Sequence, residues 1–64
     1  MKKFQIEVVD NEGKSVFIVV DVSSELAAKE IVQTLAVDGV WYPESDKKTF
    51  LPSHRIYLIH ISEK

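Results

Sequence analysis

Two stretches that are apolar on both faces constrain this chain more than any other feature of its sequence. Val16–Val22 is apolar at every position except Asp21, and Arg55–Ser62 contains the run Ile-Tyr-Leu-Ile-His-Ile. Strands of this kind are typical of the centre of a sheet, where both faces are covered. A chain of 64 residues holds one small domain and few covering elements. We therefore expect one sheet face to need a cover that the rest of the domain does not supply.

The first two thirds of the chain predict a hairpin followed by a helix. Phe4–Val9 alternates apolar and polar residues, and the turn-forming residues at 10–14 join it to Val16–Val22 as an antiparallel pair. Ser23 or Ser24 is suited to cap a helix, an apolar stripe recurs every four residues after it, and Gly39 is suited to end it. The pattern predicts a helix over 24–37.

The last third predicts short strands and one long one. A strand at 40–42 is expected to stop at Pro43, and a segment at 49–51 is expected to stop at Pro52, with its pairing left open. Arg55–Ser62 is expected to be a central strand. The order β-β-α-β-(β)-β predicts a single α+β domain over 1–64, with one helix packed on one face of the sheet. Trp41 and Phe50 are expected to fill its core.

Part of this pattern resembles the immunoglobulin-binding domain of streptococcal protein G. The resemblance lies in Val-Asp-Gly-Val-Trp-Tyr at 37–42, Lys-Thr-Phe at 48–50, and the helical segment 28–36. It implies a ββαββ arrangement as in the wider β-grasp group, a mixed four-stranded sheet with two parallel central strands. Among the positions similar to the antibody-binding residues of that family only Asp38 and Trp41 match. The resemblance therefore concerns the fold and implies no antibody binding.

Composition excludes several classes of protein. With 45% apolar and 28% charged residues the chain is too apolar to be disordered, and it has no apolar run of about 18 residues for a membrane span. It has no cysteine, so disulfides and thiolate metal sites are excluded. The net charge of -2 disfavours indiscriminate binding to nucleic acid or anionic lipid. Without a secretory signal pattern, we expect a cytoplasmic protein with no membrane partner.

No combination of side chains predicts catalysis. His54 and His60 would lie about 20 Å apart in one extended strand, too far to share a metal ion. Ser53, His54 and Asp46 are the only set resembling a catalytic triad, and neighbouring strand residues point to opposite faces. The segments 10–13 and 45–48 are expected to be turns rather than a calcium loop or an acyl-transfer motif. We expect no enzyme, cofactor, metal site or small-molecule substrate.

The function predicted from these observations is a small protein-protein interaction module, either a homodimer or a regulatory or accessory subunit, that docks through an open sheet face or a strand edge. If even-numbered residues of both apolar strands face the helix, then Phe17 and Val19 share the open face with Tyr57, Ile59 and Ile61. The alternative is a single-stranded nucleic-acid-binding protein that uses Trp41, Tyr42, Lys47, Lys48, Arg55 and Tyr57. The candidate interaction residues are Phe17, Val19, Trp41, Tyr42, His54, Arg55, Tyr57 and Ile59.

Overall fold

The computed structural model describes all 64 residues as one helix, five strands and one 3-10 turn. This confirms the α+β class and the element order. The elements are β1 (Lys2–Asp10), β2 (Ser15–Val22), α1 (Glu25–Asp38), β3 (Val40–Glu44), β4 (Lys47–Leu51), η1 (Ser53–Arg55) and β5 (Ile56–Glu63).

The β1–β2 hairpin forms where the sequence predicts it, because Asp10 organises the turn. One Asp10 carboxylate oxygen accepts hydrogen bonds from the backbone N–H groups of Glu12 and Lys14, both at 2.9 Å. Gly13 supplies the positive φ, 87°, that the turn needs. The two strands then pair antiparallel over eight residues each.

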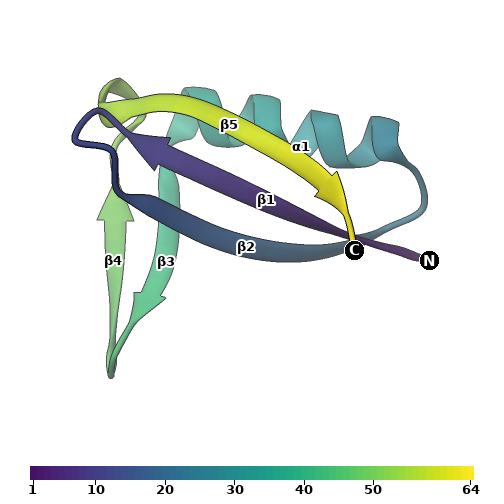
Figure 1. Cartoon of the computed structure of the whole chain (residues 1–64), viewed down its shortest axis with the longest axis horizontal. Helices are drawn as coiled ribbons and strands as arrows, with labels where there is room; N and C mark the ends of the chain where they lie inside the picture. Colours follow the sequence, from purple (N-terminus) through teal and green to yellow (C-terminus); the bar gives the residue numbers. More distant parts are fainter.

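Helix α1 matches the predicted span to within one residue. The Ser24 hydroxyl accepts a hydrogen bond from the Ala27 N–H at 3.2 Å, and the Gly39 N–H donates to the Leu35 carbonyl at 2.9 Å. The helix lies along one face of the three-stranded sheet and contacts β1, β2 and β5 (Figure 1). Ala28 is fully buried there, and Ile31 and Leu35 pack against the core.

The predicted mixed four-stranded sheet is wrong. The structure has a three-stranded sheet in the order β2-β1-β5 and a separate two-stranded sheet of β3 and β4, and every pairing is antiparallel. Strand β5 occupies the second edge of β1 and pairs with it over seven residue pairs, more than the five residues of β3 or β4 could match. The last strand is therefore an edge strand, whereas the sequence predicted a central one.

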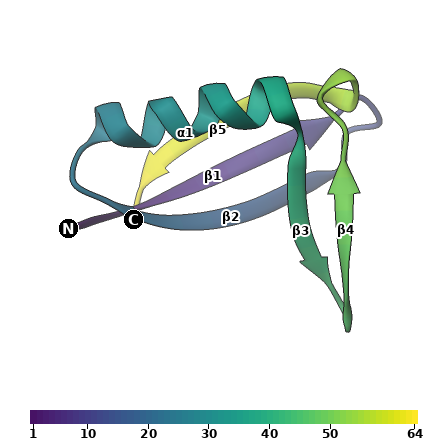
Figure 2. The same ribbon diagram turned by 180° about the vertical axis from the view of Figure 1, so that it is seen from behind.

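The β3–β4 hairpin stands away from the three-stranded sheet (Figure 2). Residues 49–51 belong to β4, which settles the open pairing, and Pro43 lies inside β3 instead of ending it. Proline is tolerated in that position because β3 has a free edge, where a missing N–H breaks no ladder bond.

The core lies between the helix and the three-stranded sheet and includes the base of the hairpin. Phe4, Ile6 and Val8 of β1 are buried together with Val40 and Leu51. Val40 and Leu51 lie directly opposite each other in the β3–β4 register, so the inner face of the hairpin base completes the core. On β2 the even-numbered residues face the helix, as predicted.

Strand β5 has the opposite orientation from the predicted one. Ile59 lies opposite Val8 and Ile61 opposite Ile6, so both face the helix and pack against the core. The register shifts by one residue at Tyr57, where a β-bulge separates Ile56 from the rest of the strand. The prediction assumes that side chains alternate without interruption from Ile56 onward, and it therefore assigns Ile59 and Ile61 to the wrong face.

Candidate functional site

The side chains offer surfaces rather than an enclosed site. No group of three or more His, Asp or Glu residues is placed to hold a metal ion, and every ion pair is at the surface. No helix is long and apolar enough to cross a membrane. There are two depressions, of about 360 and 340 Å³, and both are open to solvent.

The open face of the three-stranded sheet is mixed in character. Phe17 and Val19 are exposed on it as predicted, at 58% and 50%. Between β2 and β5, however, the central strand presents Gln5 and Glu7, and Glu7 accepts a hydrogen bond from the Ser15 hydroxyl at 2.8 Å. This polar stripe separates the apolar residues of β2 from those of β5. The predicted continuous apolar face is therefore wrong.

One depression lies where β5 begins, beside the β1–β2 turn. Tyr57 and His60 line it together with backbone and side chains of the turn. The Lys14 backbone N–H is the main cause that holds the pKa of Asp10 below its ordinary value of 3.8, helped by the Glu12 N–H and by the charges of Arg55 and Lys14. The charged Asp10 carboxylate thus stabilises the β1–β2 turn through its backbone hydrogen bonds.

Arg55 and His54 belong to η1, the short turn before β5. Arg55 forms an ion pair with Glu12, which fixes the turn against the first hairpin, and its N–H donates to the Pro52 carbonyl at 3.0 Å. His54 is exposed and forms no hydrogen bond or ion pair through its ring. Arg55 therefore has a structural partner, and only His54 of this pair is free.

The most exposed aromatic pair lies on the face of the β3–β4 hairpin that points away from the core. Trp41 and Phe50 are directly opposite each other, and their ring centroids are 4.9 Å apart at 43°. They are 66% and 42% exposed, so the prediction that they fill the core is wrong. Pro43 and Lys48 form the next pair on the same side. We call these four residues the outer hairpin face.

The inner face of the hairpin packs against the rest of the domain. Tyr42 packs against the core cluster, so it is not available as the docking residue that the sequence predicted. Glu44, also on the inner face, accepts a hydrogen bond from the Thr49 hydroxyl at 3.3 Å and pairs with Lys14 at 3.5 Å. These contacts hold the hairpin beside the start of β2.

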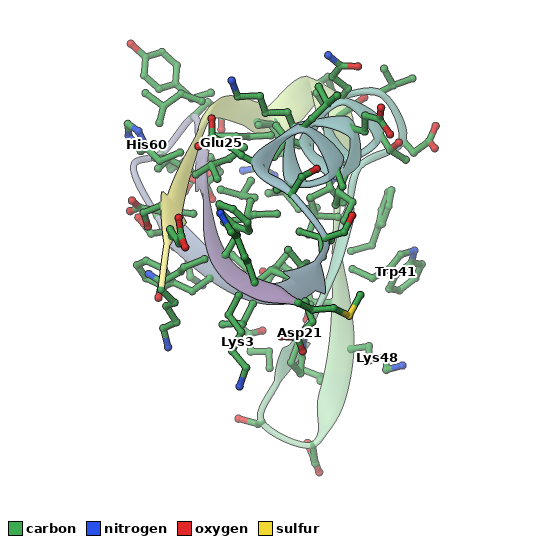
Figure 3. All side chains as sticks on the ribbon, turned by 90° about the vertical axis from the view of Figure 1, so that its right-hand side faces the viewer. Lys3, Asp21, Glu25, Trp41, Lys48 and His60 are labelled. Atoms are coloured by element: carbon green, nitrogen blue, oxygen red, sulfur yellow. The ribbon has the colours of Figure 1, made fainter.

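The predicted interaction residues are therefore divided among several places. Trp41 and Lys48 lie on the side of the molecule opposite His60 (Figure 3). Tyr57 is 72% exposed at the β5 bulge, Ile59 faces the helix, and Arg55 is engaged by Glu12. The structure brings together Trp41 with Lys48, and Phe17 with Val19.

Sequence reasoning missed that Phe50 and Pro43 share a surface with Trp41. A signal for this was present, because a hairpin with Ser45 and Asp46 at its turn places residue 41 opposite 50 and residue 43 opposite 48. Ser45 adopts a positive φ of 57° at that turn. Reading 47–51 as one strand would have revealed the outer hairpin face.

Comparison with protein-family models, with curated proteins and with solved structures finds no match.

Proposed function

We propose that this protein is an interaction module that docks on another protein through its outer hairpin face. The observation that carries the proposal is the solvent exposure of Trp41 and Phe50. Tryptophan is among the residue types that dominate binding energy at interfaces, because it offers a large rigid area with a polar tip. Two exposed rings in contact, tilted at 43° on a projecting hairpin, are an arrangement that a partner can enclose.

Neither ring is required by the fold. The core cluster is closed by aliphatic residues, with Val40 and Leu51 supplied from the opposite face of the same hairpin. Phe50 lies against Gly39, and Trp41 rests on Phe50. The rings are therefore held in place while their outer surfaces stay in water. A preorganised aromatic pair loses little side-chain freedom on binding, which favours association.

The charge on this face defines the partner further. Lys48 forms no ion pair and is the one charged residue of the outer hairpin face. An apolar pocket rimmed by carboxylates complements three apolar side chains and one free ammonium group. We therefore propose a protein partner with an acidic rim around an apolar depression.

The area available limits the affinity. The exposed parts of the two rings amount to about 250 Å², worth about 6 kcal/mol of gross hydrophobic gain. That is comparable to the cost of association, so Pro43 and Lys48 must also be contacted. We expect micromolar affinity, typical of transient regulatory contacts.

The open sheet face supports the proposal less well, because Gln5 and Glu7 divide it. Nucleic-acid binding is weaker still as an explanation. Of the six residues that it invokes, Tyr42 packs on the core, Arg55 is paired with Glu12, and Tyr57 lies at the β5 bulge. Base stacking on Trp41 remains an outcome that the experiment below distinguishes.

The test compares two equally exposed aromatic residues on different surfaces. Trp41→Ala and Tyr57→Ala each remove one exposed ring, 66% and 72% exposed, without opening the core. A photoreactive side chain placed at the exposed Asp46, at the tip of the same hairpin, in each background is used to crosslink proteins in an extract of the source cells. We expect one crosslinked protein that is retained with Tyr57→Ala and lost with Trp41→Ala.

Two results would contradict the proposal. Equal yields of the crosslinked protein in both variants would show that the indole does not contribute to docking. Loss of the crosslink after nuclease treatment, with salt-dependent quenching of Trp41 fluorescence by single-stranded oligonucleotides, would support the nucleic-acid alternative instead. Circular dichroism of both variants checks that the fold is retained.

A further inference from the structure

The outer edge of β5 is an unpaired strand with little protection against pairing beyond its first residues. Edge strands in monomeric proteins are normally blocked by lysine, proline, a β-bulge, inward charges or a covering loop. Between Ile56 and Ser62, β5 contains no charged residue and no proline, and its only irregularity is the bulge at Tyr57. A strand of this composition and length readily accepts another strand.

The backbone hydrogen bonds show which groups of β5 point outward. The Lys64 N–H donates to the Lys3 carbonyl at 2.9 Å, so Lys3 and Lys64 form a hydrogen-bonded pair of the β1–β5 ladder. Hydrogen-bonded and non-hydrogen-bonded pairs alternate along an antiparallel ladder. It follows that Ile6–Ile61 and Val8–Ile59 are non-hydrogen-bonded pairs. The N–H and C=O groups of Ile59 and Ile61 therefore point away from β1, toward solvent.

We propose that this edge pairs with β5 of a second copy of the chain, antiparallel and with the two-fold axis at His60, to form a continuous six-stranded sheet. The proposal uses a different surface from the outer hairpin face and does not depend on it. The axis lies perpendicular to the sheet, so both helices cover the same face.

The register follows from matching the two strands. Only an axis at His60 places Ile59 of one copy opposite Ile61 of the other, with both side chains on the helix face. The outward backbone groups of these residues then face each other, and the two Ile59–Ile61 pairs allow about four hydrogen bonds between the copies. Glu63 lies opposite Tyr57 of the other copy, so no like charges meet. The strand is therefore complementary to itself.

The other edge of the sheet is less suitable. The start of β2 faces the β3–β4 hairpin, which lines a depression with Lys14–Phe17 and forms the Lys14–Glu44 ion pair. Asp21 lies near the far end of β2. Its pair with Lys3 is a non-hydrogen-bonded one in the β1–β2 ladder, so its backbone groups point outward. A charge at one end and a hairpin at the other protect this edge.

The first experiment uses two substitutions in the same cross-strand row. His60 and Phe17 both lie directly opposite Glu7, on β5 and β2 respectively. His60→Lys and Phe17→Lys therefore place an ammonium beside the same carboxylate, which is compatible with the monomer fold. In the proposed dimer, His60→Lys brings two ammonium groups together at the axis, whereas Phe17→Lys is remote from it. The expected effect of His60→Lys is a dissociation constant raised about tenfold.

Light scattering after size-exclusion chromatography at about 100 µM gives the mass. We expect twice the chain mass of 7.3 kDa for the wild type and for Phe17→Lys, and a shift toward monomer for His60→Lys. A monomeric wild type would overturn the proposal. So would a dimer that Phe17→Lys dissociates and His60→Lys does not, because it would assign the interface to β2. A dimer lost only with Trp41→Ala would assign it to the hairpin.

The second experiment tests the register and does not depend on the lysine variants. The chain has no cysteine, so a single introduced cysteine can form a disulfide only with the same residue of another copy. Across the axis, residue 60 of each copy forms a non-hydrogen-bonded pair about 4.5 Å apart at Cα, within disulfide range. Residue 58 lies about 14 Å from its copy. We expect His60→Cys to crosslink under mild oxidation and Leu58→Cys not to. Equal crosslinking, or none at residue 60, would overturn the proposed register.

Discussion

Replacement of Gly39 by alanine is the sharpest test of how the helix is joined to the hairpin. Gly39 follows α1 with φ 90° and ψ -179°, a conformation that is essentially restricted to glycine. A Cβ atom there would lie 2.7 Å from the Leu51 carbonyl oxygen and 2.7 Å from the Phe50 ring. The Phe50 ring can move only by giving up part of its contact with Trp41. Leu51 is paired with Val40 in the hairpin ladder, so its carbonyl cannot move freely.

The expected loss is a large share of the total stability. The backbone conformation costs alanine about 1–3 kcal/mol. The close approach to Leu51 adds about 1–3 kcal/mol of steric cost. We therefore expect Gly39→Ala to lower the free energy of unfolding by about 2–6 kcal/mol, against about 3–10 kcal/mol expected for a domain of this size.

Gly13 provides a matched control. It also has a positive φ, 87°, but nothing lies within 4 Å of an added Cβ atom. Gly13→Ala should therefore cost only the backbone conformation, about 1 kcal/mol once the lower entropy of the unfolded chain is included.

Urea unfolding followed by far-ultraviolet circular dichroism measures both variants, because the exposed Trp41 is a poor fluorescence reporter of the core. Losses that agree to within about 0.5 kcal/mol would refute the reasoning, since the close approach of Gly39 to Leu51 would then have no energetic consequence.

Two further predictions concern local features of the fold. Ser24→Ala removes the hydroxyl that accepts from the Ala27 N–H and should lower the free energy of unfolding by about 1 kcal/mol, whereas the exposed Ser23→Ala should have little effect. Because the folded-state pKa of Asp10 lies below its ordinary value of 3.8, its charge stabilises the fold above that pH and the contribution is lost as the pH falls through the lowered pKa. The melting temperature of the wild type should therefore fall toward that of Asp10→Asn as the pH is lowered, and a constant difference would contradict this.

The elements whose signals are local in the sequence were predictable. The Asp10 turn and the Ser24 cap act within four residues of themselves, so the hairpin and the helix follow from short patterns. Sheet order is different, because it depends on a competition between β5 and the shorter strands for the free edge of β1. The seven-pair register that decides this competition joins residues more than 45 positions apart and leaves no local signal.

The candidate surfaces show the same division. The prediction that Phe17 and Val19 lie on the open face is confirmed, because β2 alternates without interruption. The prediction for Ile59 is wrong, because the bulge at Tyr57, where β5 pairs with Val9 and Asp10, reverses the alternation. The exposure of Trp41 was missed for another reason: large aromatic residues usually fill small cores, but here Val40 and Leu51 occupy that place.

The two proposed surfaces have a joint consequence that neither has alone. Trp41 and His60 lie on opposite sides of the molecule, so pairing through β5 leaves both outer hairpin faces free. A dimer then presents two copies of a weak docking site in fixed relative positions. A partner that is itself dimeric and matches that spacing would bind the second site intramolecularly, which can raise the overall affinity by about 10²–10⁴. If so, His60→Lys should weaken capture of a dimeric partner while leaving the affinity of each single hairpin face unchanged.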